Sequence, residues 1–268
     1  MKSPSLRIYA IAYLVFLYAP IILLPLFAFN DSKVVQFPLK GVTLEWFRQM
    51  AGDAQLGIAV KNSLIIALSS SILSTTLGIF AARASTRFRF PAKGALMGLI
   101  MLPMVLPEII VAMSLLIVLL AIGVKLSLFT IILGHVLVCT PFATAILTSA
   151  FQSLDKSLEE AAYDLGETPL STFRLIILPL VLPGIISAFL ICFTISIDEF
   201  IVSNFLGSGE AILSVYIFGQ FRFPAKVPSM LALGTILVLI SICLLTIAEY
   251  FRRRGIAKTG GKDTGGFL

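Results

Sequence analysis

The sequence has 268 residues, of which 58% are hydrophobic and 13% are charged, and its formal net charge is +6. Soluble domains average about half apolar and about a quarter charged residues, so this composition excludes an ordinary soluble domain and indicates a protein that folds in lipid. The positive charge does not indicate a nucleic-acid partner, because the basic residues lie in short clusters at the ends of apolar runs, without interleaved aromatic residues.

Apolar runs of about 20 residues recur along the chain, and each can cross the ~30 Å hydrocarbon layer as a helix. The first run follows Lys2 and Arg7, as in a signal peptide, but it is too long and no small-residue cleavage site follows it, so we expect a retained helix. The runs predict an all-α integral membrane protein with six transmembrane helices, at about 8–29, 58–82, 94–121, 127–150, 180–206 and 229–251.

An even number of spans places both termini on one side of the membrane. The segments that share this side hold most of the 20 Lys and Arg residues, so the positive-inside rule places both termini in the cytoplasm. The predicted transmembrane domain is 1–255, with a cytoplasmic loop at 151–179. The tail 256–268 is rich in Gly, Lys and Thr, has no apolar period and is expected to be disordered.

The segment 30–57 would then face outward. Its amphipathic piece around Trp46 is typical of a short helix lying at the membrane interface, and a packed loop is the alternative. Prolines interrupt several spans, including Pro103 and Pro107 in the third. Lipid tolerates such kinks only where neighbours or water satisfy the freed backbone carbonyls, so we expect the kinked third and fifth spans to face the bundle interior.

The cysteines and the single histidine do not indicate a metal site. Cys139, Cys192 and Cys243 lie in apolar runs without metal-ligand spacing, and we expect small packed residues. His135 has no Cys, Asp or Glu nearby in the sequence, so a packed or helix-bridging role is favoured over metal binding.

The loop between the fourth and fifth spans predicts two short helices. Ser157 and Glu160 can form a capping box, and Gly166 is a natural helix end, so the first helix has about two turns. A second helix is expected from about Ser171. The first helix should carry its apolar residues on one face: Leu158, Ala161, Ala162 and Leu165.

Three acidic residues fall inside apolar spans: Glu108, Asp198 and Glu199. A charge near the centre of a spanning helix costs roughly 2.5–3.5 kcal/mol even on the lenient insertion scale, so these acids are functional candidates. Glu108 and Asp198 are equally far from the cytoplasmic starts of their spans and would lie at one level in straight helices. Neither span holds a Lys or Arg near them, so a cationic substrate could supply the missing charge; pairing with a second subunit, or exposure to water, is the alternative.

The loop carries the motif E-A-A-x3-G-x9-I-x-L-P at Glu160, Ala161, Ala162, Gly166, Ile176, Leu178 and Pro179. In this motif and its position the chain resembles the permease subunits of binding-protein-dependent ABC importers. The resemblance implies a type I importer permease fold, in the bacterial inner membrane, with a coupling helix that docks on a partner ATPase. The coupling residues would be Glu160, Ala161, Ala162, Asp164, Leu165 and Gly166.

The same resemblance implies the partners of the chain. They are an ABC ATPase dimer, a second permease subunit of different sequence and a periplasmic substrate-binding protein. ATP and Mg would be bound by the ATPase, and this chain would need no cofactor of its own.

The N-terminal LYAPIILLPLFAFNDSK, PEIIVAMSLL and the SIDEF stretch are similar to the permeases of spermidine and putrescine importers. This resemblance implies a polyamine substrate and a substrate pathway past Glu108, Asp198 and Glu199. In that subfamily aspartates would be more usual at the positions of Glu108 and Glu199. The longer glutamate side chains could shape the path for a different amine, which therefore stays open as the substrate. Related importers carry opines, aminophosphonates or iron, which stay open as alternatives.

Two other classes of function are alternatives. An intramembrane enzyme could use Asp198, Glu199 or His135, but the chain shows no Walker-A loop, nucleophile elbow or HExxH motif, so we expect no enzyme. A proton-driven secondary transporter could use Glu108 and Asp198, but no inverted repeat is evident in the sequence.

Overall fold

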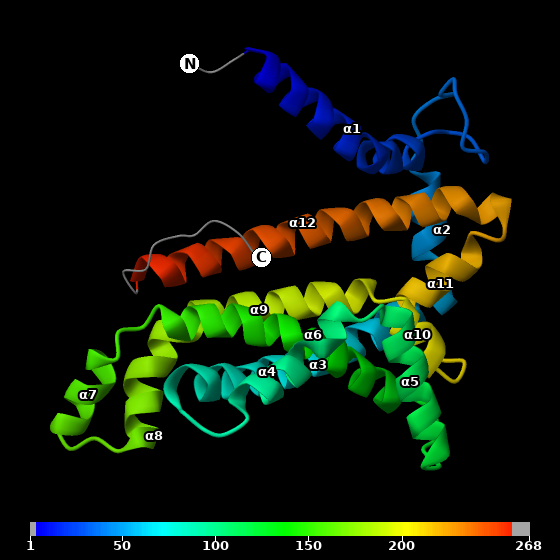
Figure 1. The fold of residues 1–268 in the computed structure, drawn as a ribbon. Coiled ribbons are helices and arrows are strands. Elements are labelled where there is room, and N and C mark those ends of the chain that lie inside the picture. The colour runs from blue at the N-terminus through cyan, green and yellow to red at the C-terminus, as the bar shows by residue number, and fades with distance from the viewer. Residues whose placement is uncertain (1–3, 259–268) are drawn as a thin grey trace. The chain divides into compact units, whose positions relative to one another are not determined.

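The computed structural model describes residues 4–258, and within them the chain is helical, with one isolated bridge between Asn30 and Val42 and no strand (Figure 1). The α-helices are α1 (Pro4–Ala28), α2 (Glu45–Ala51), α3 (Ala54–Arg87), α4 (Lys93–Val105), α5 (Glu108–Ala121), α6 (Leu128–Gln152), α7 (Ser157–Asp164), α8 (Pro169–Thr172), α9 (Leu178–Asp198), α10 (Ile201–Leu206), α11 (Leu213–Gln220) and α12 (Val227–Lys258). A π-helical turn, Phe173–Ile177, joins α8 to α9, and a 3-10 turn, Pro224–Lys226, precedes α12.

Five of the described helices are long and apolar enough to cross a membrane, and α4 with α5 makes a sixth span if the bent pair crosses together. The axes of α4 and α5 differ by 110°. Leu106 has extended backbone, ψ 147°, because the ring of Pro107 disfavours a helical conformation in the residue before it. A kink was expected in this span from its prolines, and the structure places a bend of 110° before Pro107. The equal-level argument for Glu108 and Asp198 counted residues along straight helices, so it loses its geometric basis.

The fifth apolar segment is also divided. Its helix α9 ends at Asp198, and α10 begins at Ile201 after the extended backbone of Glu199, ψ 110°. Unlike the bend at Pro107, this break has no proline or glycine in the sequence from Ser196 to Ser203. Its cause must lie in side-chain interactions.

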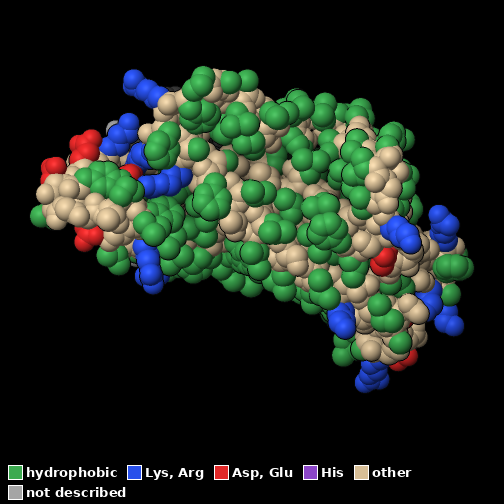
Figure 2. All heavy atoms as spheres, turned by 90° about the horizontal axis from the view of Figure 1, so that it is seen from below, with side chains coloured by type: hydrophobic (Ala, Val, Ile, Leu, Met, Phe, Trp, Pro, Cys, Tyr) green, Lys and Arg blue, Asp and Glu red, His purple; other side chains and the backbone are tan. Residues whose placement is uncertain are grey.

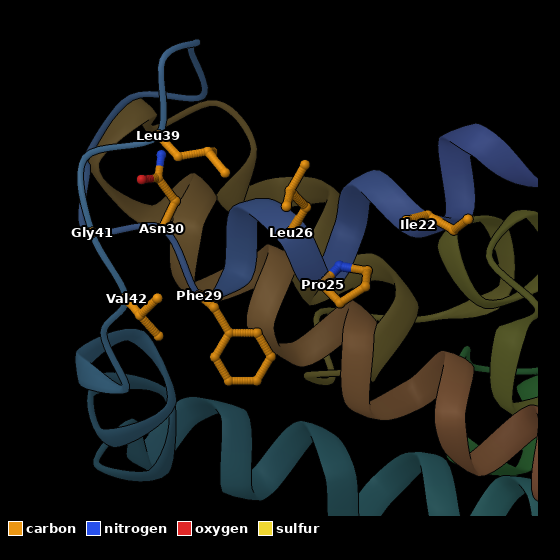
Figure 3. A pocket seen from close by; sticks show the side chains of 8 residues that line it. All are labelled: Ile22, Pro25, Leu26, Phe29, Asn30, Leu39, Gly41 and Val42. Atoms are coloured by element: carbon orange, nitrogen blue, oxygen red, sulfur yellow. The ribbon is translucent and has the colours of Figure 1, made fainter.

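One compact unit comprises residues 1–58 and 216–241. Trp46 of α2 is buried, with 4% of its surface exposed, and its Nε1 donates to the Asn30 carbonyl at 2.8 Å. The short helix was predicted, but its tryptophan packs inside this unit instead of facing the membrane interface. Apolar side chains from the end of α1 and the following loop line a pocket of about 350 Å³ (Figure 3).

Asp53 connects the two chain segments of this unit, 1–58 and 216–241. Its carboxylate accepts a hydrogen bond from the Tyr216 hydroxyl at 2.6 Å and lies 3.8 Å from the Lys226 ammonium. It also accepts the backbone N–H groups of Gln55 and Leu56 at the start of α3. The Tyr216 hydrogen bond, chief among these contacts, lowers the pKa of Asp53.

The second unit, 59–215 with 242–268, holds most of the core. Helices α6 and α9 run side by side in it (Figure 1). Cys139 and Cys192 face each other between these helices, and each thiol lies within 3.6 Å of the other's backbone carbonyl oxygen. Both are small packed residues, as expected, whereas Cys243 is exposed in this chain.

Charged side chains gather at the end of this unit where α7 and α8 lie, and mainly hydrophobic side chains cover the adjoining helices (Figure 2). This distribution fits a bundle whose middle faces lipid and whose α7–α8 end faces water.

A close approach of α3 to α6 depends on Gly78. A Cβ at Gly78 would lie 2.9 Å from the Ala143 Cβ and 3.0 Å from the Ala143 backbone carbonyl carbon, neither of which can rotate away. We predict that Gly78→Val lowers stability by about 1–3 kcal/mol through overpacking, measured as the thermal unfolding midpoint in detergent. Gly57→Val is the matched control on the same helix, since a Cβ there meets nothing within 4 Å. Equal midpoints for the two variants would contradict the close packing.

Candidate functional site

Outside the apolar spans, residues 157–172 form a hairpin of two short helices, α7 and α8. At the end of α7, Gly166 has φ +85°, its N–H donates to the Tyr163 carbonyl at 2.9 Å, and the Glu167 N–H donates to the Ala162 carbonyl at 3.1 Å. These two bonds form a Schellman motif, which requires a left-handed residue best supplied by glycine. The predicted helix end at Gly166 is confirmed.

The predicted capping box at the start of α7 was wrong. The carboxylate of Asp155 accepts the backbone N–H of Ser157 at 3.0 Å, and the Ser157 and Glu160 side chains do not cap the helix. The backbone hydrogen bond from Ser157 is the main reason why the pKa of Asp155 lies below its usual value. The positive N-terminal end of the helix dipole also stabilises the negative charge of Asp155.

The two faces of α7 differ from the predicted single apolar face. Ala162 and Glu159 are buried against the rest of the unit. The other predicted coupling residues lie exposed on the hairpin: Glu160, Ala161, Asp164, Leu165 and Gly166. Leu165 is 86% exposed and Leu170 is 77% exposed, so two large apolar side chains protrude at the tip of the hairpin. Exposed apolar side chains on an otherwise polar projection are typical of a surface that a partner covers.

Glu159, which the sequence reasoning passed over, fixes α7 to the end of α3. Its carboxylate lies 2.5 Å from the Arg87 Nε and 3.6 Å from an Arg83 guanidinium nitrogen. Arg87 also donates to the Leu154 carbonyl at 3.1 Å, and the Arg83 guanidinium lies 4.8 Å from the centre of the Phe173 ring. We call Arg83, Arg87 and Glu159 the α3–α7 clamp.

The clamp is well shielded from water, with side-chain exposures between 9% and 17%. Low exposure strengthens the attraction between opposite charges and makes loss of one partner costly. The sequence did carry a signal for it. Arg83 and Arg87 are four residues apart, which places two cations on one face of α3 beyond its apolar run.

The intramembrane acids lie at the two helix breaks. Glu108 is the first residue of α5, beside the 110° bend, and is exposed in this chain. Glu199 lies in the break between α9 and α10, is 8% exposed, and accepts the Val202 N–H at 3.0 Å. Helices α5 and α10 pack against each other, so Glu108, which begins α5, and Glu199, which precedes α10, lie on neighbouring elements. Asp198, the last residue of α9, is exposed.

The structure therefore places Glu108 and Glu199 on adjoining elements, and Asp198 directly precedes Glu199 in the chain. Among the described residues, no Lys or Arg forms an ion pair with any of these three acids. A pocket of about 420 Å³ opens beside Glu108 at the α4–α5 bend. Its lining is otherwise uncharged: Pro103, Met104, Leu106, Pro107, Ile109, Val138, Phe142 and Ile201. One carboxylate among aliphatic and aromatic walls suits an ammonium group on an apolar stem.

Within residues 4–258, no cluster of three or more His, Cys, Asp or Glu side chains could hold a metal ion.

Comparison with known proteins matches residues 74–256 to the family of binding-protein-dependent transport system inner membrane components. The spermidine/putrescine transport system permease protein PotC of Haemophilus influenzae is 34% identical over 240 residues, which cover 89% of this chain and 93% of PotC. The putrescine transport system permease protein PotI of Escherichia coli K12 is 34% identical over 246 residues, covering 89% of this chain and 87% of PotI.

Solved structures with the same fold have lower sequence identity. A chain of a bacterial ABC transporter for import of the acidic polysaccharide alginate aligns with a TM-score of 0.70 at 18% identity, over 92% of this chain and 98% of that chain. A chain of the MetNI methionine ABC transporter aligns with a TM-score of 0.62 at 18% identity, over 75% of this chain and 95% of that chain.

The clamp makes a prediction for the local stability of α7. Replacing the acid in Glu159→Gln leaves two shielded guanidinium groups without their counter-charge, and we expect the opening of α7 to become easier by about 3 kcal/mol. Amide hydrogen exchange of residues 157–166 in the purified chain measures this. Glu160→Gln is the control, because Glu160 is exposed and neighbours Glu159 on the same helix. Equal exchange in both variants would show that the clamp does not hold α7.

Proposed function

Because the chain belongs to the family of binding-protein-dependent transport system inner membrane components, we propose that it moves a small cationic solute, most simply a polyamine such as spermidine or putrescine, from the periplasm to the cytoplasm. Its class follows from the family: it is a multi-pass permease subunit of an ABC importer and not an enzyme. The identity of the cargo, the residues that meet it and the detailed assembly are the proposal.

The observation that supports a cationic cargo is the pair of acidic residues at the two helix breaks. Glu108 and Glu199 lie at the starts of two helices that pack together, α5 and α10, and have no Lys or Arg ion-pair partner in the described chain. Two such charges in a membrane-spanning bundle repel each other and lose solvation, so a passing cation offsets both costs. Several weak sites also suit transport better than one tight site, since the cargo must leave again.

The names of the relatives support the same cargo. PotC of Haemophilus influenzae is named for spermidine and putrescine transport, and PotI of Escherichia coli is named for putrescine transport. Both alignments cover 89% of this chain at 34% identity. The alginate and methionine importers share the fold only, so they carry no weight for the cargo.

The α7–α8 hairpin is the proposed contact with the ATPase. Its exposed coupling residues and the protruding Leu165 would dock on an ABC ATPase dimer, which binds ATP and Mg. The α3–α7 clamp would pass the motion of the docked helix to α3 and so to the bundle. A second permease of different sequence and a periplasmic binding protein would complete the importer, with both termini of this chain in the cytoplasm.

The cargo proposal predicts a charge effect on uptake. Asp198→Asn keeps the size of the side chain and removes its charge, which should lower uptake of a polyamine at least about fivefold, corresponding to about 1 kcal/mol for one partly hydrated ion contact. Uptake of labelled putrescine and spermidine is measured in cells and divided by the amount of permease in the membrane. Glu108→Gln should act in the same direction.

Asp31→Asn is the control for that experiment, because Asp31 is an exposed aspartate in the loop after α1. Wild-type uptake by Asp198→Asn and Glu108→Gln, or a neutral or anionic cargo of the cognate binding protein, would refute the charge argument.

The docking proposal predicts uncoupling at Gly166. Gly166→Asp forces a side chain into a left-handed position, at a cost of about 1–2 kcal/mol, and should distort the end of α7. Transport should fall while the assembled complex still hydrolyses ATP, measured together in proteoliposomes. Gly209→Asp is the matched control, since Gly209 has φ +96° and open space but lies away from the hairpin. If Gly166→Asp couples as well as Gly209→Asp, the hairpin is not the docking element.

A further inference from the structure

His135 lies at the centre of a hydrogen-bonded group that the proposed function leaves unused. Its imidazole is 1% exposed, its Nδ1 lies 2.7 Å from the Ser196 Oγ, and its Nε2 lies 3.0 Å from the Ser203 Oγ. The Ser196 Oγ is also 3.0 Å from the Ser70 Oγ. All four side chains are buried, so four helices, α3, α6, α9 and α10, meet in one polar group.

The position of this group is informative. Ser196 lies in the last turn of α9 and Ser203 lies in the short α10, so the imidazole spans the break that contains Asp198 and Glu199. On the same break, Glu199 accepts the Val202 N–H, and the Glu199 carbonyl accepts the Ser214 hydroxyl at 2.9 Å. The two ends of the break are thus held by directional bonds on several sides.

Such bonds are needed here because the sequence of the break does not force it. Residues 196–203 contain neither proline nor glycine, so the chain could continue as helix and recover its backbone hydrogen bonds. Apolar packing of Val202 and Leu206 against α6 stabilises α10, but it does not replace the directional backbone hydrogen bonds that the break gives up. A neutral imidazole offers one donor and one acceptor nitrogen, so it can bond both hydroxyls at a fixed separation.

We propose that His135 is a positioning residue for cargo passage: by bridging Ser196 and Ser203 it holds the α9–α10 break open and so sets where the Asp198 and Glu199 carboxylates lie. This inference rests on the proposed function, because it assumes that these carboxylates meet the cargo. The imidazole itself does not touch the cargo, since it is enclosed on all sides.

The test uses the assembled importer in proteoliposomes with its binding protein, and the readout is labelled putrescine transported per ATP hydrolysed. This ratio does not depend on how much complex assembles, so a variant that merely folds less well leaves it unchanged. His135→Leu, which removes both bonds, should lower the ratio about tenfold or more, because small displacements of positioned groups cost large factors. Thr144→Val is the matched control, as a buried hydroxyl on the same helix that bonds only its own backbone.

Conservative variants separate the two bonds. The amide of His135→Asn can replace Nδ1 and keep the bond to Ser196, whereas His135→Gln can replace Nε2 and keep the bond to Ser203. Each should recover part of the ratio lost in His135→Leu. Adding Ser203→Ala to His135→Asn should cost nothing more, because that bond is already absent, whereas adding Ser196→Ala to it should reproduce His135→Leu.

Two results would overturn the inference: a wild-type ratio in His135→Leu while Asp198→Asn lowers it, or losses that add independently in the two double variants. Failure of the proposed function looks different. In that case Asp198→Asn and Glu199→Gln leave the ratio at the wild-type value, whatever the His135 variants do.

Discussion

A hydrocarbon environment offers no hydrogen-bond partner to a freed backbone group, and this constraint explains both the helices of the chain and the places where they stop. At the α4–α5 bend, Pro107 has no N–H to satisfy, and the N–H of Leu106 still finds the Leu102 carbonyl at 3.2 Å. At the α9–α10 break no proline helps, and the Glu199 carboxylate takes up the freed Val202 N–H. Each break inside the apolar region therefore needs its own local solution, and each solution leaves an acid beside it.

The α7–α8 hairpin follows different rules because it carries the polar composition of a water-facing segment. Here water can satisfy backbone groups, so a positive-φ glycine and an aspartate cap suffice to end and start α7. Hydration does not fix the orientation of such a short helix relative to the rest of its unit. The α3–α7 clamp provides it, since Glu159 lies between two arginines of one long helix. Through Glu159, the buried face of α7 is therefore tied to the end of α3, while its other face stays exposed.

Much of this was predictable from the sequence. The apolar runs predicted the spanning helices, and Gly166 predicted the end of α7. The substrate pathway past Glu108, Asp198 and Glu199 stays a prediction. The register of α7 was not predictable, because Glu159 and Glu160 are identical side chains and only the packed structure decides which one faces Arg87. The 110° bend was also missed, since Pro103 and Pro107 in the sequence indicate a kink but not its size.

The three acids are not equivalent, because they lie at different ends of their helices. Glu108 opens α5 and Glu199 caps α10, and at a helix N-terminus the dipole stabilises a negative charge by about 0.3–1 kcal/mol. This offsets only part of the roughly 2.5–3.5 kcal/mol that a charge costs at the centre of a membrane helix. Asp198 ends α9, where the dipole opposes its charge, and among residues 4–258 no hydrogen bond to its side chain offsets this cost. In the proposed pathway Asp198 thus gains most from a passing cation, while Glu108 and Glu199 are partly stabilised before the cargo arrives.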